Sequence, residues 1–377
     1  MRKGWEYKKL GEIAKCAIGL TYKPENVTEE LSGTIVLRSS NIQNSILDFN
    51  DIVRVNVPVK EDKIVKDGDI LMCSRNGSIR LVGKVALIKN LKERMSYGAF
   101  MTIIRSQYNP YLFEYFKTPA FRQYLIAGKT TTVNQITVKM LNNLTIPLPP
   151  KSTQLAIVSE LDKINELIRL KKEQLKDFDN LAQSLFYEMF GDPVENEKGW
   201  EVKKLIEVSS LINGRAYKQN ELLSEGKYKV LRVGNFFTNS NFYYSNLELE
   251  DEKYCYKGDL LFAWSASFGA FIWDEDKTIF HYHIWRVLFD KAILDIHYYQ
   301  YLLNTMTSFF MNDVHGIGMV HLTKSGMEQY ELPLPPLSLQ QLFAQRIEQI
   351  ERENSEVQKS IQDLETLLAS RMQYWFE

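Results

Sequence analysis

The 377-residue sequence contains only three cysteines, Cys16, Cys73 and Cys255, which lie far apart and include no CxxC pair. This spacing indicates neither a disulfide framework nor a zinc ribbon. No apolar run approaches the ~18 residues of a membrane span, and the first residues lack the apolar core of a signal peptide. Charge of one sign is not in excess either, because 46 Lys and Arg balance 47 Asp and Glu. We therefore expect a soluble, cytoplasmic protein of ordinary globular composition.

Motifs of nucleotide and methyl-transfer chemistry are also missing. No glycine-rich loop ends in Gly-Lys-Ser/Thr, and no predicted strand is followed by GxGxxG. The proline pairs occur as Leu-Pro-Pro ahead of predicted helices, which is not the catalytic loop of an amino-methyltransferase. His281 and His283 could share one face of a strand, but the spacing indicates no third metal ligand. The sequence therefore predicts no catalytic residue and no metal site.

A tandem repeat organises what is present. The segment GWEYKKL at 4–10 returns as GWEVKKL at 199–205, and PLPP at 147–150 returns at 333–336. Between them, Leu37-Arg38 and Gly68-Asp69 recur in the same order as Leu231-Arg232 and Gly258-Asp259. Chance hardly supplies four matches in sequence order, so the chain is a tandem duplication.

Each copy begins with a globular segment, at 1–150 and 199–336. Short apolar runs bounded by Gly, Asn, Ser or Asp predict strands joined by turns. Residues 109–125 and 295–310 have the pattern of amphipathic helices. The fold class predicted is therefore α+β, with two tandem mixed α/β segments.

A long helical pattern follows each globular segment, within 151–198 and 337–377. Ser152 and Ser338 stand two residues after the last proline of each run and are expected N-caps. Apolar residues then recur at alternating steps of four and three, which is the period of a coiled coil. The large apolar seam positions are Ile157, Leu161, Ile164, Ile168, Leu175, Phe178, Leu185, Phe343, Ile347, Ile350, Val357, Ile361, Leu364 and Leu368.

Two such seams in one chain can bury each other. We therefore predict that the long helices separate the globular segments and form an antiparallel coiled coil, which gives the chain approximate two-fold symmetry. Lys171 and Asn354 interrupt the two seams. Asn354 either fixes the register of the pair, as a buried asparagine can, or simply approaches the surface.

Charge is distributed unevenly between the copies. Residues 1–150 carry a net charge of +9, whereas residues 199–336 carry −4. A strongly basic domain attracts polyanions, because each phosphate that it neutralises releases counterions. The second segment would need local basic residues for the same purpose, such as Lys203, Lys204, Arg215, Lys218 and Arg232. Charge therefore indicates nucleic acid more strongly for the first copy than for the second.

The duplicated order of motifs resembles the specificity subunit of type I restriction–modification enzymes over essentially the whole chain. The opening segments 4–10 and 199–205 carry this resemblance, followed by 18–21 and 212–215, by 37–42 and 231–236, and by 67–77 and 83–86. The segments 135–137 and 321–323 before the proline runs complete it. Glu160–Ile164 and Phe190–Pro193 also match the family. The second copy departs from the pattern at 263–269, which lacks the basic residue of Ser74-Arg75 and makes its contacts harder to name.

The resemblance implies a subunit that recognises DNA and is not an enzyme by itself. Segments 1–150 and 199–336 would be target-recognition domains that each read one half of a bipartite DNA sequence. Segment 151–198 would be the first spacer helix and linker, and 337–377 the second spacer helix, on which methyltransferase subunits dock. The implied partners are double-stranded DNA, two methyltransferase subunits and two restriction/translocase subunits. S-adenosylmethionine, ATP and magnesium would belong to those partners, leaving this chain without a cofactor.

The expected DNA contacts are polar residues in turns near strand ends. Arg, Asn and Gln suit the edges of guanine and adenine, whereas Lys and Thr suit phosphates. The candidates are Arg38, Asn41, Arg75, Asn76, Arg80, Lys84, Thr130, Asn134, Gln135, Arg215, Lys218, Arg232, Asn235, Ser265, Ser267 and His321. Each could instead be a solvated loop residue. Two other functions also stay open, a pseudo-symmetric scaffold that binds only proteins and a self-sufficient modification or cleavage enzyme.

Overall fold

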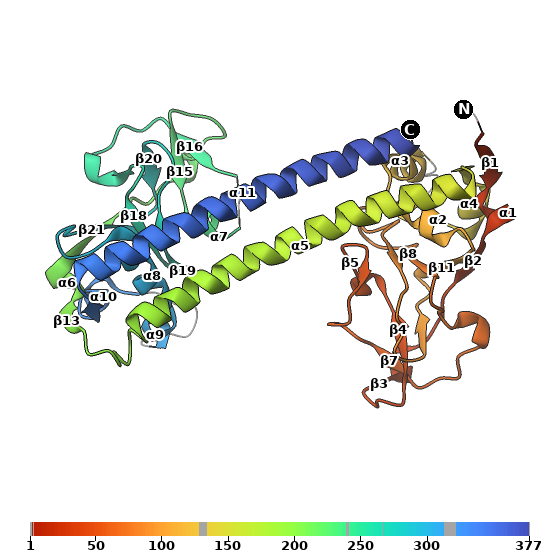
Figure 1. The fold of residues 1–377 in the computed structure, drawn as a ribbon, viewed down its shortest axis with the longest axis horizontal. Coiled ribbons are helices and arrows are strands. Elements are labelled where there is room, and N and C mark those ends of the chain that lie inside the picture. The colour runs from red at the N-terminus through yellow and green to blue at the C-terminus, as the bar shows by residue number, and fades with distance from the viewer. Residues whose placement is uncertain are drawn as a thin grey trace. The chain divides into compact units, whose positions relative to one another are not determined.

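The computed structural model describes residues 2, 4–127, 134–238, 241–265, 267–312 and 322–376. The chain forms two compact units (Figure 1). Unit 1 comprises Met1–Lys171 with Ser360–Glu377, and unit 2 comprises Lys172–Lys359. Each unit mixes helices with sheets, and both long helices contribute to both units. The predicted fold class is confirmed.

Three sheets and a short hairpin build unit 1. The central antiparallel sheet has the order β2-β11-β8-β9, and its middle strands are rich in buried apolar residues. A second sheet has the order β10-β4-β7-β3, in which β10 and β4 are parallel. The strands are β1 (Glu6–Lys9), β2 (Lys15–Ile18), β3 (Val27–Thr28), β4 (Thr34–Leu37), β5 (Ile42–Gln43), β6 (Ile46–Leu47), β7 (Arg54–Val55), β8 (Ile70–Cys73), β9 (Val85–Leu87), β10 (Met95–Tyr97), β11 (Met101–Arg105) and β12 (Thr145–Leu148).

Short helices connect these strands. The helices of unit 1 before the long one are α1 (Leu10–Ile13), α2 (Asn109–Phe116), α3 (Pro119–Ala127) and α4 (Val138–Asn143), with 3-10 turns η1 (Pro24–Asn26), η2 (Ser39–Asn41) and η3 (Glu61–Lys63). Strand β1 pairs with β12, so the opening motif of the copy lies against its proline segment.

Unit 2 repeats this plan with the sheets β14-β21-β18-β19, β16-β15-β20-β17 and β13-β22. Its strands are β13 (Glu201–Lys204), β14 (Ser209–Asn213), β15 (Tyr228–Leu231), β16 (Tyr243–Ser245), β17 (Tyr254–Cys255), β18 (Leu260–Ser265), β19 (Ser267–Ile272), β20 (Thr278–Phe280), β21 (Ile284–Phe289) and β22 (Glu331–Leu334). Its short helices are α6 (Leu205–Val208), η4 (Gln219–Glu221), α7 (Val233–Phe237), η5 (Asp251–Lys253), α8 (Ile296–Thr305), α9 (Thr307–Asn312) and α10 (Lys324–Met327).

Equivalent hydrogen bonds occur within each of the two copies. The Tyr111 hydroxyl donates to the carbonyl of Pro147 at 2.5 Å, and the Tyr298 hydroxyl donates to the carbonyl of Pro333 at 2.8 Å. Both tyrosines are almost fully buried, so each bond satisfies a polar group inside a core. The repeat in the sequence is therefore a repeat of structure.

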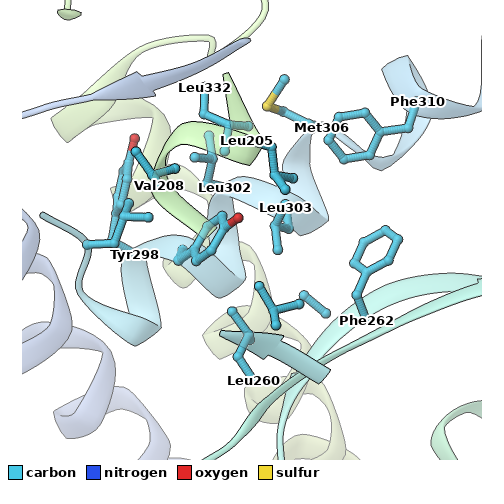
Figure 2. Close-up of a cluster of buried hydrophobic side chains, with 14 of the residues drawn as sticks. Leu205, Val208, Leu260, Phe262, Tyr298, Leu302, Leu303, Met306, Phe310 and Leu332 are labelled. Atoms are coloured by element: carbon cyan, nitrogen blue, oxygen red, sulfur yellow. The ribbon is translucent and has the colours of Figure 1, made fainter. Parts of the chain in front are cut away.

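The core of unit 2 lies between α8 and the sheet that contains β18. Leu260 and Phe262 of β18 face Tyr298, Leu302 and Leu303 of α8 (Figure 2). Leu205 and Val208 of α6 close the same cluster. All these side chains are nearly inaccessible to water, so burial of apolar area is the main source of their stabilisation.

The two long helices, α5 (Lys151–Phe190) and α11 (Leu337–Phe376), have 40 residues each. In unit 1 the start of α5 lies beside the end of α11, where Arg371 forms an ion pair with Glu160. The indole of Trp375 also donates to Glu160, at 2.8 Å. The Arg371 guanidinium, and then this indole, lower the pKa of the Glu160 carboxyl.

In unit 2 the end of α5 lies beside the start of α11. The ring of Phe343 is 5.8 Å from that of Phe186 and 5.3 Å from that of Phe190. The two helices therefore run antiparallel within each unit. All fourteen predicted seam side chains are buried or half-buried. Asn354 is half-buried and its described hydrogen bond goes to Gln358 of its own helix, which favours a position near the surface over a register lock.

The prediction of serine N-caps is wrong. Both long helices begin one residue earlier, directly after proline, and Ser152 and Ser338 lie exposed in their first turns. Two buried glutamines hold these turns instead. The side-chain amide of Gln154 donates to the carbonyl of Pro149, and that of Gln340 to Pro335, both at 2.8 Å.

No helix of the described residues is both long and apolar enough to span a bilayer.

Candidate nucleic-acid interface

In unit 1 the loop that follows β8 lies against the segment before α4. An isolated bridge joins Arg75 to Gln135, and the backbone N–H of Asn76 donates to the carbonyl of Asn134 at 3.3 Å. The fold thus brings together four predicted DNA contacts from segments about 60 residues apart. We call Arg75, Asn76, Asn134 and Gln135 the recognition patch.

Some of the hydrogen-bonding capacity of the recognition patch is engaged within the protein. The amide of Asn134 donates to the carbonyl of Gly77 at 2.9 Å, and that of Asn76 donates to the hydroxyl of Ser39 at 3.2 Å. Arg75 is exposed, and its guanidinium lies 5.5 Å from the centre of the Phe100 ring. Arg75 therefore presents its N–H donors to solvent beside an exposed aromatic face, a combination suited to a base or a phosphate.

Arg38 and Arg232 begin an equivalent turn in each copy, and an asparagine side chain holds the backbone of each turn. The side-chain oxygen of Asn41 accepts from the backbone N–H of Arg38, and that of Asn235 accepts from the backbone N–H of Arg232, both at 2.8 Å. Asn41 is 1% exposed and also donates to the carbonyls of Asp48 and Asp51. No polar group of Asn41 is left for a base unless the loop opens.

The remaining candidates of unit 1 are dispersed. Arg38 forms an ion pair with Asp51 at 2.7 Å. Arg80 is exposed, and Lys84 is half-buried beside a cavity at the far end of the loop from Arg75. Thr130 lies outside the described residues.

Unit 2 contains a cavity of about 1600 Å³ beside α7, β16 and the end of β19. Aromatic side chains dominate it, and the rings of Phe236 and Phe271 stack with their centres 4.1 Å apart. The guanidinium of Arg232 lies at the rim, 5.4 Å from the Tyr243 ring. The lining includes Arg232, Asn235, Phe236, Phe242, Tyr243, Tyr244, Phe271, Trp273, His281 and His283. Aromatic faces with a few hydrogen-bonding groups can stack on bases and read their edges.

Arg215 and Lys218 lie outside this lining. Arg215 forms an ion pair with Glu221 at 2.8 Å, so its charge is already balanced. Lys218 is exposed. Ser267 is half-buried and Ser265 is 1% exposed, which leaves Ser265 unable to reach a ligand in this conformation. His321 lies outside the described residues.

His281 and His283 are the site residues that the sequence argument set aside. Burial lowers the pKa of His281 to about 4, and the nearby His283 and Arg232 add to this effect. His281 is therefore neutral at physiological pH and can offer a donor and an acceptor. Among the described residues no group of three His, Cys, Asp or Glu side chains could hold a metal ion. The alternating pattern His281-Tyr282-His283 is the feature of the sequence that could have indicated this site. It indicates polar contacts with a ligand rather than a metal ion.

Comparison with known proteins shows the family of the chain. The profile of the family described as "Type I restriction modification DNA specificity domain" matches residues 2–177 and again 197–366. The chain therefore belongs to this family. On this membership it is a DNA target-recognition subunit and not by itself an enzyme, as the sequence predicted. Nothing in the comparisons supports the protein-binding scaffold.

Individual relatives have low sequence identity to this chain, but several of them match most of its length. The putative type I restriction enzyme MjaX specificity subunit of Methanocaldococcus jannaschii is 24% identical over 97% of this chain and 92% of its own length. The EcoKI specificity subunit of Escherichia coli is 25% identical over 62% of this chain and 54% of its own length. A chain from a study of complex assembly and conformational transition of the type I R-M system has a TM-score of 0.62 at 20% identity, covering 100% of this chain and 98% of that one. The S subunit from M. genitalium has a TM-score of 0.56 at 14% identity, covering 99% and 96%.

Proposed function

We propose that the chain reads a bipartite DNA sequence, with segment 1–150 recognising one half and segment 199–336 the other. In this proposal the long helices within 151–198 and 337–377 set the separation of the two domains and dock methyltransferase subunits. The observation that carries it is the duplication itself. Each copy builds the same fold and displays a different set of side chains, the recognition patch in unit 1 and the lining of the cavity in unit 2.

The two surfaces suit different contacts. The recognition patch, with Arg80 and Lys84 beyond it, belongs to a segment of net charge +9 and suits guanine edges and phosphates. The cavity of unit 2 belongs to a segment of net charge −4 and suits stacking and neutral hydrogen bonds. We assign Arg75, Asn76, Gln135 and Arg232 as base contacts, with His281 and His283 beside them.

The partners follow from the family. A structural neighbour comes from a study of type I R-M complex assembly, and this supports an analogous complex for the present chain. We propose two methyltransferase and two restriction/translocase subunits, acting on double-stranded DNA in the cytoplasm. S-adenosylmethionine, ATP and magnesium would bind to those subunits and not to this chain.

An exchange of domains tests the proposal. Residues 1–150 are replaced by the first domain of a relative with a different target, and methylated sites are mapped in the presence of the partner methyltransferase. One half of the target is expected to change completely while the other half is retained. The donor needs apolar residues facing Ile157, Leu161, Met372 and Phe376, because these side chains complete the core of unit 1.

The reciprocal exchange of residues 199–336 is the matched control and must alter only the other half. The assignment would be contradicted if either exchange left the methylated sequence unchanged. It would also be contradicted if a single exchange changed both halves of that sequence. Purified wild-type chain with its methyltransferase must also bind DNA in a salt-dependent way; a protein scaffold would not.

A further inference from the structure

A small polar cavity in unit 1 is separate from the recognition patch. Its volume is about 200 Å³, and it lies among the loop before β9, the end of α2 and the start of α3. Three cationic side chains and two hydroxyls line it, from Lys84, Lys117, Arg122, Ser45 and Thr118. We call this cavity the cation pocket.

Arg122 is held in a defined orientation. Its guanidinium donates to the carbonyl of Val82 at 2.6 Å and to that of Arg80 at 3.0 Å. These bonds use two of the five N–H donors of an arginine, and the planar group keeps the others in a fixed fork. Gly83 follows at φ +85°, and a Cβ there would come within 2.5 Å of Leu125. The loop is thus pressed against α3, and the guanidinium is fixed before any ligand binds.

The other two cations differ in their balance. The Lys117 ammonium lies 2.6 Å from a carboxylate oxygen of Glu114, which is 1% exposed. Burial raises the pKa of this carboxyl, and Lys117 opposes that rise. Lys84 is half-buried and forms no ion pair with any described residue. With Glu114 ionised, the pocket carries two uncompensated positive charges beside the apolar walls of Phe116 and Phe121.

Unit 2 has no such cations at the equivalent positions. The paired tyrosine bonds of Tyr111 and Tyr298 place Lys117 at the position of Asn304. The strand pairs Ile70 with Leu87 and Leu260 with Ile272 place Lys84 at the position of Gly269.

In unit 2 Asn304 is bonded to the backbone of β19. Its side chain accepts from the N–H of Ala270 at 2.7 Å and donates to the carbonyl of the same residue at 3.0 Å. The shared fold is therefore stable without cations at this place, and a structural role in the common scaffold does not account for them.

We propose that the cation pocket binds a single phosphate group, and that this group belongs to the backbone of the DNA read by unit 1. The assignment to DNA rests on the proposed function; the phosphate chemistry does not. The volume is below the range of roughly 300–1,000 Å³ usual for pockets that hold drug-sized ligands, which favours one anion over a whole nucleotide. A fixed guanidinium fork with a lysine beside it matches a tetrahedral oxyanion.

The cation pocket lies at the end of the loop that carries part of the recognition patch. Arg80 and Lys84 end the loop that begins with Arg75 and Asn76, so a phosphate in the pocket would hold that loop in register with the bases. The contact carries no sequence information by itself, and its loss weakens binding to every sequence alike.

Inorganic phosphate is the direct probe. The full chain is titrated with phosphate in a calorimeter, and one site per chain is expected. Lys84→Gln should weaken this site roughly tenfold, because it removes a hydrogen bond to a charged group. Lys66→Gln is the matched control, since Lys66 is exposed and outside the pocket. Arg122→Lys keeps the positive charge but removes the planar set of N–H donors of the guanidinium, so it should also lower the affinity for phosphate.

Duplex DNA is the second probe, with the same variants. Lys84→Gln should lower the affinity for target and random duplex equally, and reduce the slope of log affinity against log salt by about 1. Wild-type chain that binds no phosphate, or binds it as well after Lys84→Gln, would overturn the pocket. If Lys84→Gln weakens the binding of inorganic phosphate but leaves DNA binding unchanged, the phosphate in the pocket does not come from the DNA backbone. The pocket would then bind a free anion. A chain that binds no DNA with its partner refutes the proposed function, and the phosphate titration still decides the pocket.

Discussion

Replacing Phe343 by alanine is expected to lower the free energy of unfolding of unit 2 by about 3–5 kcal/mol. The ring is fully buried and lies within 6 Å of three others, those of Phe186, Phe190 and Tyr301. Its removal leaves a cavity where α11 and α5 meet the globular core, and rings held by several elements cannot close it.

Denaturation of the full chain measures this loss. Hydrogen exchange must follow peptides from 260–306, because a chain of two units need not unfold in one step. Leu342→Ala is the control on the neighbouring position, where the side chain is 43% exposed, and should cost less than about 1 kcal/mol. A similar small cost for Phe343→Ala would show that the helix start is not part of the core of unit 2.

Periodicity in the sequence could predict the long helices and the stripe along which they meet. It could not predict Phe186, Phe190, Met372 and Phe376, which lie off the predicted seam and are all buried. The seam describes a helix with one partner. At their ends α5 and α11 pack against both each other and a globular domain, so the apolar surface widens beyond one stripe.

The candidate site was predictable only where residue type and loop position decide it. The four residues of the recognition patch do lie together, because the loop after β8 pairs with the segment before α4. Asn41 has the right chemistry for a base but satisfies three backbone groups of its own loop. Two of those partners, Asp48 and Asp51, stand seven and ten residues away, so no local sequence motif indicates them.

Gly19 and Gly214 belong to the matching segments 18–21 and 212–215, and the structure gives a physical reason for this match. A Cβ on Gly19 would lie 2.2 Å from the carbonyl oxygen of Tyr97, and one on Gly214 would lie 2.2 Å from that of Phe280. At both places the following residue forms a parallel bridge to the chain after a buried strand. Neither glycine has a positive φ, so the requirement is for space between two backbones and not for an unusual conformation.

Gly19→Ala and Gly214→Ala should therefore each destabilise their own unit by about 3 kcal/mol, because the added methyl group must push two backbones apart. Gly77→Ala is the control, since its Cβ would meet nothing within 4 Å and its φ is not positive. It should be neutral or slightly stabilising. Hydrogen exchange of β10 and β20 in the full chain distinguishes the units: Gly19→Ala should increase exchange in β10 alone, and Gly214→Ala in β20 alone. A large cost at only one of the two positions would mean that this motif does not play the same part in both copies.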